Sequence, residues 1–249
     1  MTQANHHDRV AVVTGAAGGL GQAFALRLAA AGYRLVLTDR ASCEPLAARI
    51  RDDGGSASAL DCDLADADDV QAFAARVLAQ AGRVDLLLNN AAYMEFAGLA
   101  ELTPKLWREI QTVNVEAPML LAQAFAPGMA GRGWGRIVNL ASSTVWGPPP
   151  RMLAYVSSKM AVIGLTRALA AELGPQGITV NAISPGLTKH AGSAASLPEP
   201  AFEAVRARQF VPRTEVPGDL VGILAFLAGE ESGFITGQVF NVDGGGFGF

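Results

Sequence analysis

The stretch Arg9-Val-Ala-Val-Val-Thr-Gly-Ala-Ala-Gly-Gly-Leu-Gly21, with the helix-forming run 22–31 after it, decides the fold. Its apolar first half is typical of a buried strand in a parallel sheet. Glycines let a backbone approach a pyrophosphate, and the N-terminus of the next helix offers free N–H groups. The spacing Gly15-x-x-x-Gly19-x-Gly21 differs from the G-x-G-x-x-G fingerprint, so a simple tight turn is the competing interpretation.

Residues 34–39 form a second predicted strand, which ends in Asp39, eighteen residues after Gly21. A carboxylate at this distance from a glycine loop is typical of a group that binds the ribose of an adenosine. It would accept hydrogen bonds from the ribose hydroxyls and repel a 2′-phosphate, which favours NAD over NADP as cofactor. Arg40 follows directly and could bind that phosphate instead, so the choice between the two cofactors stays open.

The rest of the chain continues this alternation of strands and helices. It predicts an α/β fold, a single Rossmann-like doubly wound domain with a seven-stranded parallel sheet and helices on both faces. Residues 1–8 are predicted to be a disordered N-terminal tail, and residues 9–249 a single dinucleotide-binding catalytic domain with an irregular substrate lid at about 187–210. The remaining strands are predicted at 57–60, 84–88, 134–140, 178–183 and 238–242, and the remaining helices at 45–53, 66–80, 103–129, 154–173, 203–209 and 217–229.

Composition and charge narrow the class of protein. The 249 residues carry a net charge of −4, which argues against nucleic acid and an anionic membrane surface as partners. Two cysteines fit a reducing, cytoplasmic location, and the polar N-terminus is not a signal peptide. With only three histidines, two of them in the polar tail, we expect no metal site.

A second informative stretch runs from Ser142 to Tyr155-x-x-x-Lys159. A spacing of four places the phenol and the ammonium on one face of a helix. Tyrosine has a pKa of about 10, and a nearby positive charge favours its ionised form, so the lysine is expected to lower the pKa of Tyr155. Ser142 follows an apolar run and would lie at the carboxyl end of a strand, facing Tyr155. The pattern alone is common by chance.

Taken together, these motifs make the chain resemble the short-chain dehydrogenase/reductase family over nearly its whole length. One departure is Ala92, where the family usually has glycine; it adds only a methyl group, and we expect no loss of activity. The resemblance implies an oxidoreductase that acts on CH–OH groups, with one Rossmann-like domain, usually in a homotetramer. The matching residues are Thr14-Gly15-x-x-x-Gly19-x-Gly21, Asp63-Leu64, Asn89-Asn90-Ala91, Asn114, Ser142, Tyr155-x-x-x-Lys159 and Pro185-Gly186-x-Thr188.

The resemblance also implies roles for individual residues. Tyr155 would be the general acid/base, Ser142 would fix the substrate oxygen, Lys159 would bind the nicotinamide ribose, and Asn114 would hold a water that links Lys159 to solvent. A proton must leave oxygen as hydride leaves carbon, so base, anchor and cofactor must converge. The implied cofactor-binding residues are Gly15, Gly18, Gly19, Leu20, Gly21, Asp39, Asp63, Leu64, Asn90, Tyr155, Lys159, Pro185, Gly186 and Thr188.

The walls of the substrate pocket are predicted to be apolar and partly aromatic, which suits a small-molecule, ring-bearing or cyclic alcohol. Short stretches of the chain are similar to 1-phenylethanol dehydrogenases and pyridoxal 4-dehydrogenase within the same family, whose substrates carry rings. The alternatives are a 3-oxoacyl carrier-protein reductase, a sugar dehydrogenase and a non-catalytic binding protein of the same fold. The predicted pocket residues are Tyr93, Met94, Phe96, Val145, Trp146, Met152, Leu187 and His190.

A homotetramer is further favoured by the C-terminus. The last predicted strand is a sheet edge followed by Phe247 and Phe249 on a glycine-rich tail, and such an edge needs cover. We expect the tail to lie near a neighbouring subunit's lid, the alternative being a tail folded back on its own subunit.

Overall fold

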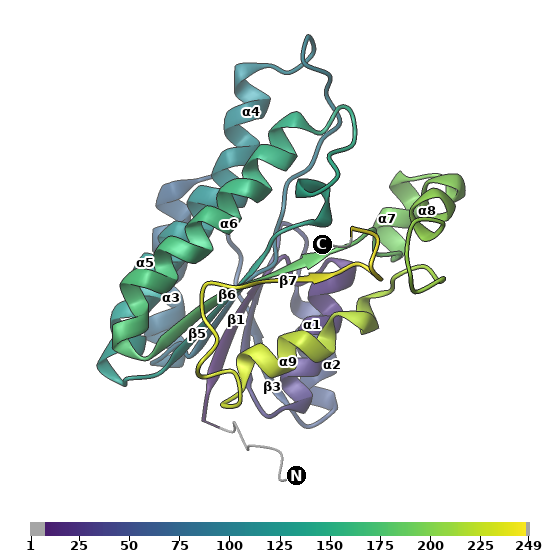
Figure 1. Ribbon diagram of the computed structural model, residues 1–249. Coiled ribbons are helices and arrows are strands. Elements are labelled where there is room, and N and C mark those ends of the chain that lie inside the picture. The colour runs from purple at the N-terminus through teal and green to yellow at the C-terminus, as the bar shows by residue number, and fades with distance from the viewer. Residues whose placement is uncertain (1–7, 248–249) are drawn as a thin grey trace.

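Seven parallel strands form one sheet in the computed structural model, which describes residues 8–247 (Figure 1). The strand order is β3-β2-β1-β4-β5-β6-β7, and the predicted α/β fold is confirmed. The predicted tail therefore lies outside the described residues except for Asp8, and so does Phe249. The strands are β1 (Val10–Thr14), β2 (Arg34–Thr38), β3 (Ser56–Ala59), β4 (Leu86–Asn89), β5 (Gly135–Leu140), β6 (Ile178–Pro185) and β7 (Val239–Val242).

Helices cover both faces of the sheet (Figure 1). One face carries α1 (Gly19–Ala30), α2 (Glu44–Asp52) and α9 (Val221–Ala228). The other carries α3 (Ala67–Ala81), α5 (Ala117–Gly131) and α6 (Leu153–Leu173), with α4 (Pro104–Gln111) leading into α5. The short helices α7 (Ala191–Ser196) and α8 (Glu199–Arg206) stand apart from the sheet. Within residues 8–247, no helix is long and apolar enough to cross a membrane.

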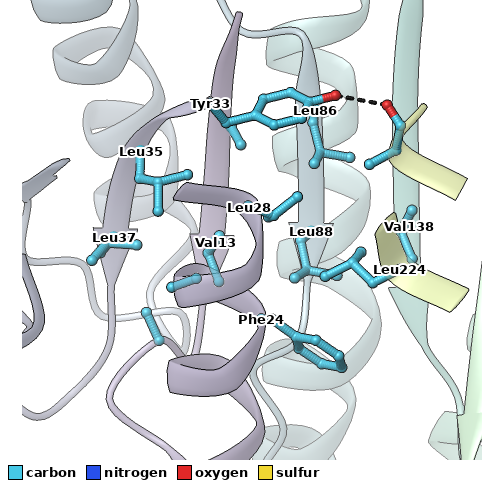
Figure 2. Packing of buried hydrophobic residues seen from close by; sticks show 14 of the residues in the cluster. Val13, Phe24, Leu28, Tyr33, Leu35, Leu37, Leu86, Leu88, Val138 and Leu224 are labelled. Atoms are coloured by element: carbon cyan, nitrogen blue, oxygen red, sulfur yellow. Dashed lines mark hydrogen bonds between the residues drawn. The ribbon is translucent and has the colours of Figure 1, made fainter. Parts of the chain in front are cut away.

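The core under α1 shows why this layering is stable (Figure 2). Phe24 and Leu28 of α1 are fully buried against Val13 of β1 and Leu88 of β4. Burying each such side chain contributes about 1.5–3 kcal/mol. The hydroxyl of buried Tyr33 donates to the carbonyl of Ala228 at 2.6 Å, which ties the start of β2 to the end of α9.

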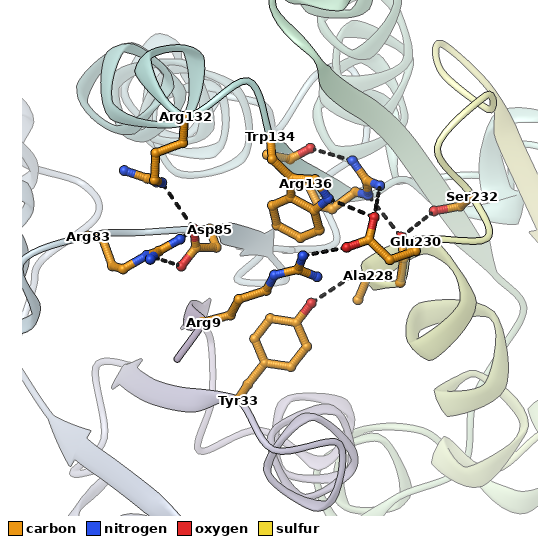
Figure 3. Close-up of polar contacts among 12 residues, drawn as sticks. Arg9, Tyr33, Arg83, Asp85, Arg132, Trp134, Arg136, Ala228, Glu230 and Ser232 are labelled. Carbon is orange, nitrogen blue, oxygen red and sulfur yellow. Dashed lines mark hydrogen bonds and ion pairs between the residues drawn. The ribbon is translucent and has the colours of Figure 1, made fainter. Parts of the chain in front are cut away.

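Charged side chains gather at the amino ends of the strands (Figure 3). Arg9 pairs with Glu230 and stacks on the ring of Trp134, with its guanidinium carbon 3.7 Å from the ring centroid. Buried Asp85 is bonded by Arg83 and Arg132, at 2.7 and 3.3 Å. This end of the sheet is closed by paired charges, which leaves the carboxyl ends of the strands for a site.

Two predicted segments differ from the structure. The predicted lid at about 187–210 is not irregular at its start. Residues 191–196 form α7, because the His190 side chain accepts from the Ser193 N–H while the Ser193 hydroxyl accepts from the His190 N–H. The following helix, α8, begins at Glu199 rather than at residue 203. The single helix predicted at 103–129 is interrupted by a π-helical turn, Thr112–Glu116, in which the backbone widens around Asn114.

Candidate active site

A groove of about 570 Å³ opens at the carboxyl ends of the strands, on both sides of the boundary between β1 and β4. Chain order reverses at this boundary, and open α/β sheets bind ligands at such switch points. Most of the predicted cofactor residues line it. The lining residues are Gly15, Gly18, Gly19, Leu20, Gly21, Asp39, Arg40, Cys62, Asp63, Leu64, Ala65, Asn90, Ala91, Ala92, Tyr93, Glu109, Val113 and His190.

The glycine loop has the conformation that its sequence requires. Gly15 adopts a φ of +65°, which other residues rarely adopt. A Cβ on Gly21 would lie 2.0 Å from the carbonyl oxygen of Gly15, so only glycine lets the helix start this close to the strand. Gly18 has no side chain to cap α1, which leaves the N–H groups of its first turn for a ligand. Asn90 donates to the carbonyls of Thr14 and Gly15, both at 2.9 Å, and fixes the loop to the end of β4.

Acidic residues border the groove beyond β2 and β3. The Asp39 carboxylate accepts the backbone N–H of Ala17 at 3.0 Å and so stands beside the glycine loop, while Arg40 is exposed. Asp63 accepts the N–H of Ala65 in a turn, and Leu64 is buried in the core while still lining the groove. For Leu64, core packing and contact with a ligand are therefore compatible.

The predicted catalytic residues meet at the ends of β5 and the start of α6. Ser142 lies two residues beyond β5 and is hydrogen-bonded to Tyr155. Lys159 follows Tyr155 by one helical turn, and its Nζ lies 5.6 Å from the centre of the tyrosine ring. The ammonium donates to the carbonyl of Leu140 at 2.7 Å, which anchors α6 on the last residue of β5. Serine, phenol and ammonium thus converge as the sequence predicts.

The electrostatics of this cluster differ from the prediction in one respect. Burial raises the pKa of Tyr155 above its usual 10, and the hydrogen bond with Ser142 opposes this only in part. The sequence predicts that Lys159 lowers the pKa of Tyr155, but Lys159 is not among the causes of the shift. Burial also lowers the pKa of Lys159 from 10.5 to about 8. Both groups are shifted toward their neutral forms because the protein interior disfavours charge.

Asn114 connects three parts of the site. Its side chain accepts the N–H of Tyr93 at 2.7 Å and donates to the carbonyl of Tyr93 and to the hydroxyl of Ser158, both at 2.9 Å. Ser158 is the neighbour of Lys159, so Asn114 holds α6 against the segment after β4. The widened turn Thr112–Glu116 places the Asn114 side chain in this position, where it is buried.

A series of hydrogen bonds between buried polar side chains, which the sequence analysis does not predict, joins β4 and β5 to α6. Asn89 of β4 donates to Asn139 of β5 at 2.8 Å, and Asn139 donates to Thr166 of α6 at 2.9 Å. All three side chains are buried. Buried amides with partners of this kind fix one relative position of the elements that they join.

The turn after β6, residues 186–190, closes the site from the other side. Thr188 is buried and donates to the carboxylate of Glu215 at 2.5 Å, and Gly186 donates its N–H to the same carboxylate at 3.0 Å. A Cβ on Gly19 would lie 2.5 Å from the ring of His190, so the ring rests on the glycine loop. The turn that begins with Pro185 and Gly186 therefore reaches the dinucleotide groove.

The predicted substrate residues fall into different surroundings. Met94 and Phe96 are exposed by 41% and 43% of their surfaces. Val145 and Trp146 are half-buried in a small apolar cluster beside α6. Met152 is buried, and its backbone pairs with that of Ala97 in an isolated parallel β-bridge. Val145 and Trp146 therefore pack against a cluster that includes Ala141, the neighbour of Ser142 in the chain.

The other predicted substrate residues lie nearer the dinucleotide groove. Tyr93 lines it and donates its hydroxyl to Glu95 at 2.6 Å. His190 lines it through its contact with Gly19, and Leu187 is half-buried just before Thr188. In the structure Tyr93 and His190 line the dinucleotide groove, and their part in the substrate pocket stays a prediction.

Several residues that line the groove are not predicted by the sequence motifs. Glu109 of α4 and Val113 of the π-helical turn lie four residues apart, a spacing that places both on one helix face. Cys62 and Ala65 flank the predicted pair Asp63–Leu64. Glu215 could not be found from the sequence, since it lies far along the chain from Thr188 and in no motif.

The geometry defines a class of protein, a dinucleotide-binding oxidoreductase. The groove, the open N-terminus of α1 and the carboxylate beside the loop fit a nicotinamide adenine dinucleotide. The shape of the loop requires these glycines, because a Cβ on Gly19 would clash with the His190 ring and one on Gly21 with the carbonyl oxygen of Gly15.

Comparison with known proteins agrees with this class. A family model described as "Enoyl-(Acyl carrier protein) reductase" matches residues 15–246. The chain is 34% identical over 242 residues to Dehydrogenase/reductase SDR family member 4 of Pongo abelii, covering 96% of this chain and 87% of the relative. It therefore belongs to the short-chain dehydrogenase/reductase family and is an oxidoreductase that acts on CH–OH groups.

Solved structures share the fold closely. An NAD+-bound xylitol dehydrogenase has a TM-score of 0.90 and 31% identity, with 97% of this chain and 100% of that chain covered. A 3-oxoacyl (acyl-carrier-protein) reductase from Agrobacterium tumefaciens C58 with NADP bound has a TM-score of 0.91 and 31% identity, with 97% and 95% covered. The two neighbours differ in both substrate class and cofactor.

Proposed function

We propose that the protein interconverts a secondary or cyclic alcohol and its carbonyl product, with NAD(H) as cofactor and Tyr155 as general acid/base. The observation that carries the proposal is the convergence of Ser142, Tyr155 and Lys159 at the end of β5, next to a glycine-loop groove. When bound, the nicotinamide supplies the hydride acceptor or donor. The protein's part is to hold the alcohol oxygen and move its proton.

In oxidation, the substrate oxygen would lie between the hydroxyl of Ser142 and the phenol of Tyr155. The Ser142 hydroxyl already contacts the Thr144 hydroxyl at 2.9 Å, which fixes its position before substrate arrives. Tyr155 must be ionised to take the proton, and burial opposes that. The nearest fixed cation is Lys159, so its charged form stabilises the phenolate. Asn114 would support this arrangement by holding α6 and by binding a water beside Lys159.

The preference for NAD over NADP rests on Asp39. Its carboxylate stands beside the glycine loop, bonded to the N–H of Ala17, in the position where a ribose hydroxyl would bind. A 2′-phosphate at about 4 Å from a carboxylate is repelled even where water screens the charges. Arg40 is exposed and adjacent, and weakens the preference without reversing it.

The substrate we propose is a ring-bearing, largely apolar alcohol. Val145 and Trp146 pack against a cluster that includes Ala141, the neighbour of Ser142, and Met94 and Phe96 are exposed apolar side chains of the loop after β4. The second candidate is a sugar alcohol, favoured by the xylitol dehydrogenase among the structural neighbours. An activity screen over aryl alcohols, pyridoxal, cyclic alcohols and sugar alcohols with NAD distinguishes the two.

We also propose a homotetramer. The residues of edge strand β7 are only half-buried, and Phe234, just before it, is fully exposed. Exposed apolar surface beside an open sheet edge is typical of a contact with another copy of the chain. The described part of the tail follows the alternative prediction, since Phe247 folds back onto Gly147 of its own chain.

The chemistry is tested by Tyr155→Phe. The variant should lose about 10²–10⁴-fold in kcat, the usual contribution of a positioned acid/base, while it still binds NADH. Retention of more than a few per cent of kcat at saturating substrate would show that another group moves the proton. In the oxidative direction the wild-type rate should rise with pH.

A further inference from the structure

Glu215 is a buried carboxylate that the proposed chemistry does not use. It lies between α8 and α9, and 4% of its surface is exposed. Among residues 8–247 no cation forms an ion pair with it: Arg213 is bonded to Asp219, and Lys189 to Glu199. The other charged groups that face it, Asp219 and Asp243, are both acidic. Burying an ionised carboxylate costs free energy unless hydrogen bonds or a charged partner compensate for the lost water.

Within the part of the chain that the structure describes, the hydrogen bonds of Glu215 all go to one turn. The carboxylate accepts the Thr188 hydroxyl at 2.5 Å on Oε1 and the Gly186 N–H at 3.0 Å on Oε2. The backbone carbonyl of Glu215 accepts the N–H of Lys189 at 2.8 Å. A Cβ on Gly186 would lie 2.7 Å from Oε2, so the glycine is what admits the carboxylate. The same turn ends at His190, whose ring rests on the glycine loop.

We infer that Glu215 is a positioning residue for the bound dinucleotide: its ionised carboxylate holds the 186–190 turn and accepts the hydrogen bond of the Thr188 hydroxyl, so that the lone pairs of the Thr188 oxygen face the nicotinamide carboxamide. This inference rests on the proposed function, since it assigns Thr188 to the nicotinamide end of the groove. Glu215 itself touches neither substrate nor cofactor.

The direction of the Thr188 hydrogen bond depends on the protonation of Glu215. Oε2 faces the N–H of Gly186 and must stay an acceptor, so an added proton sits on Oε1. The acid then donates to Thr188, and the Thr188 hydroxyl must turn its own hydrogen away, toward other acceptors. The acid then occupies one of the two lone pairs of the Thr188 oxygen, and the Thr188 hydrogen competes for the position of the carboxamide N–H, which weakens the contact with the carboxamide.

Burial, reinforced by the two acidic neighbours, raises the pKa of Glu215 to about 7. The ionised form, which favours binding, is therefore present above about pH 7 and is lost as the pH falls below it. The loss of one hydrogen bond corresponds to an affinity change of about tenfold. The affinity for NADH should fall by about that factor between pH 8 and pH 6.

Glu215→Gln tests the inference, because glutamine imitates the protonated acid at every pH. Its amide oxygen takes the place of Oε2 and its NH₂ takes the place of the protonated Oε1. We expect the variant to bind NADH about tenfold more weakly than wild type at pH 8, equally at pH 6, and with no inflection between them. KM for NAD should rise more than kcat falls. Fluorescence titration with NADH measures the affinity.

Two control variants separate positioning from other causes. Thr188→Val removes the hydroxyl, and in that background Glu215→Gln should have no further effect on affinity. His190→Asn removes the imidazole that lines the groove, and it should keep the inflection at about pH 7. A Glu215→Gln variant that keeps the inflection, or binds NADH as wild type does at pH 8, overturns the inference. Wild-type protein that binds no nicotinamide dinucleotide would instead refute the proposed function.

Discussion

Replacing Lys159 by methionine should stabilise the protein at neutral pH while removing its activity. Lys159 is only 2% exposed, and burial lowers its pKa from 10.5 to about 8. A shift of this size corresponds to about 3 kcal/mol of destabilisation while the ammonium is charged. Methionine removes that penalty and also removes the hydrogen bond to the carbonyl of Leu140, which costs about 1–2 kcal/mol. The net gain at pH 7 is about 1–2 kcal/mol.

The sign of this difference must reverse with pH. Since the folded-state pKa lies below the unfolded-state value, the folded protein binds fewer protons between about pH 8 and 10.5, and its stability rises through that window. The penalty is full below about pH 8 and nearly absent at pH 10.5. There the methionine variant keeps only the lost hydrogen bond and should be less stable than wild type by about 1 kcal/mol.

Urea denaturation followed by circular dichroism, at one protein concentration and at pH 7 and 10.5, measures both values. Lys105→Met is the matched control, because the Lys105 side chain is 84% exposed and its removal should change stability little at either pH. A stability difference for Lys159→Met with the same sign and size at both pH values would refute the reasoning. So would turnover close to wild type, since Lys159 would then not support Tyr155.

The remaining predictions concern cofactor choice, the tail and assembly. Asp39→Ala should narrow the preference for NAD over NADP by about fivefold or more, measured as the ratio of kcat/KM values, since repulsion at 4 Å is about 1 kcal/mol even in water; no change would remove Asp39 from cofactor selection. Phe247→Ala should change KM for the alcohol and leave KM for NAD unaltered, because the Phe247 ring packs on Gly147 in the loop after Ser142; equal effects on both would indicate general loosening. Light scattering at micromolar concentration should give about four times the 25.8 kDa chain mass, and a mass near one chain would exclude the tetramer.

The sheet and the glycine loop could be predicted because their determinants are local. A short apolar run, a positive-φ glycine and a helix follow each other within about twenty residues, and each pattern has one structural solution. The spacing of Tyr155 and Lys159 likewise fixes their shared helix face. The position of Ser142 opposite them follows from parallel strands, whose carboxyl ends all meet at one edge.

Features that depend on packing between distant segments could not be predicted. The pKa of Tyr155 was expected to fall because of a nearby cation, yet burial dominates it, and burial is a property of the whole fold. The contact between His190 and Gly19 joins residues that no motif relates. The π-helical turn at Asn114 adds one residue to a helical turn, which side-chain periodicity does not reveal.

The distribution of buried charge separates the two ends of the sheet. At the amino ends, Asp85 is held between two arginines, so its charge is compensated within the fold. At the carboxyl ends, Lys159 and Glu215 are as deeply buried, but among residues 8–247 neither forms an ion pair. Both have pKa values moved toward neutrality, to about 8 and about 7. A buried charge without a partner lowers the stability of the fold. Its restriction to the carboxyl ends of the strands is explained if a ligand that binds there supplies the partners that Lys159 and Glu215 lack. Saturating NADH should therefore raise the Tm of wild-type protein by more than that of Glu215→Gln at pH 8.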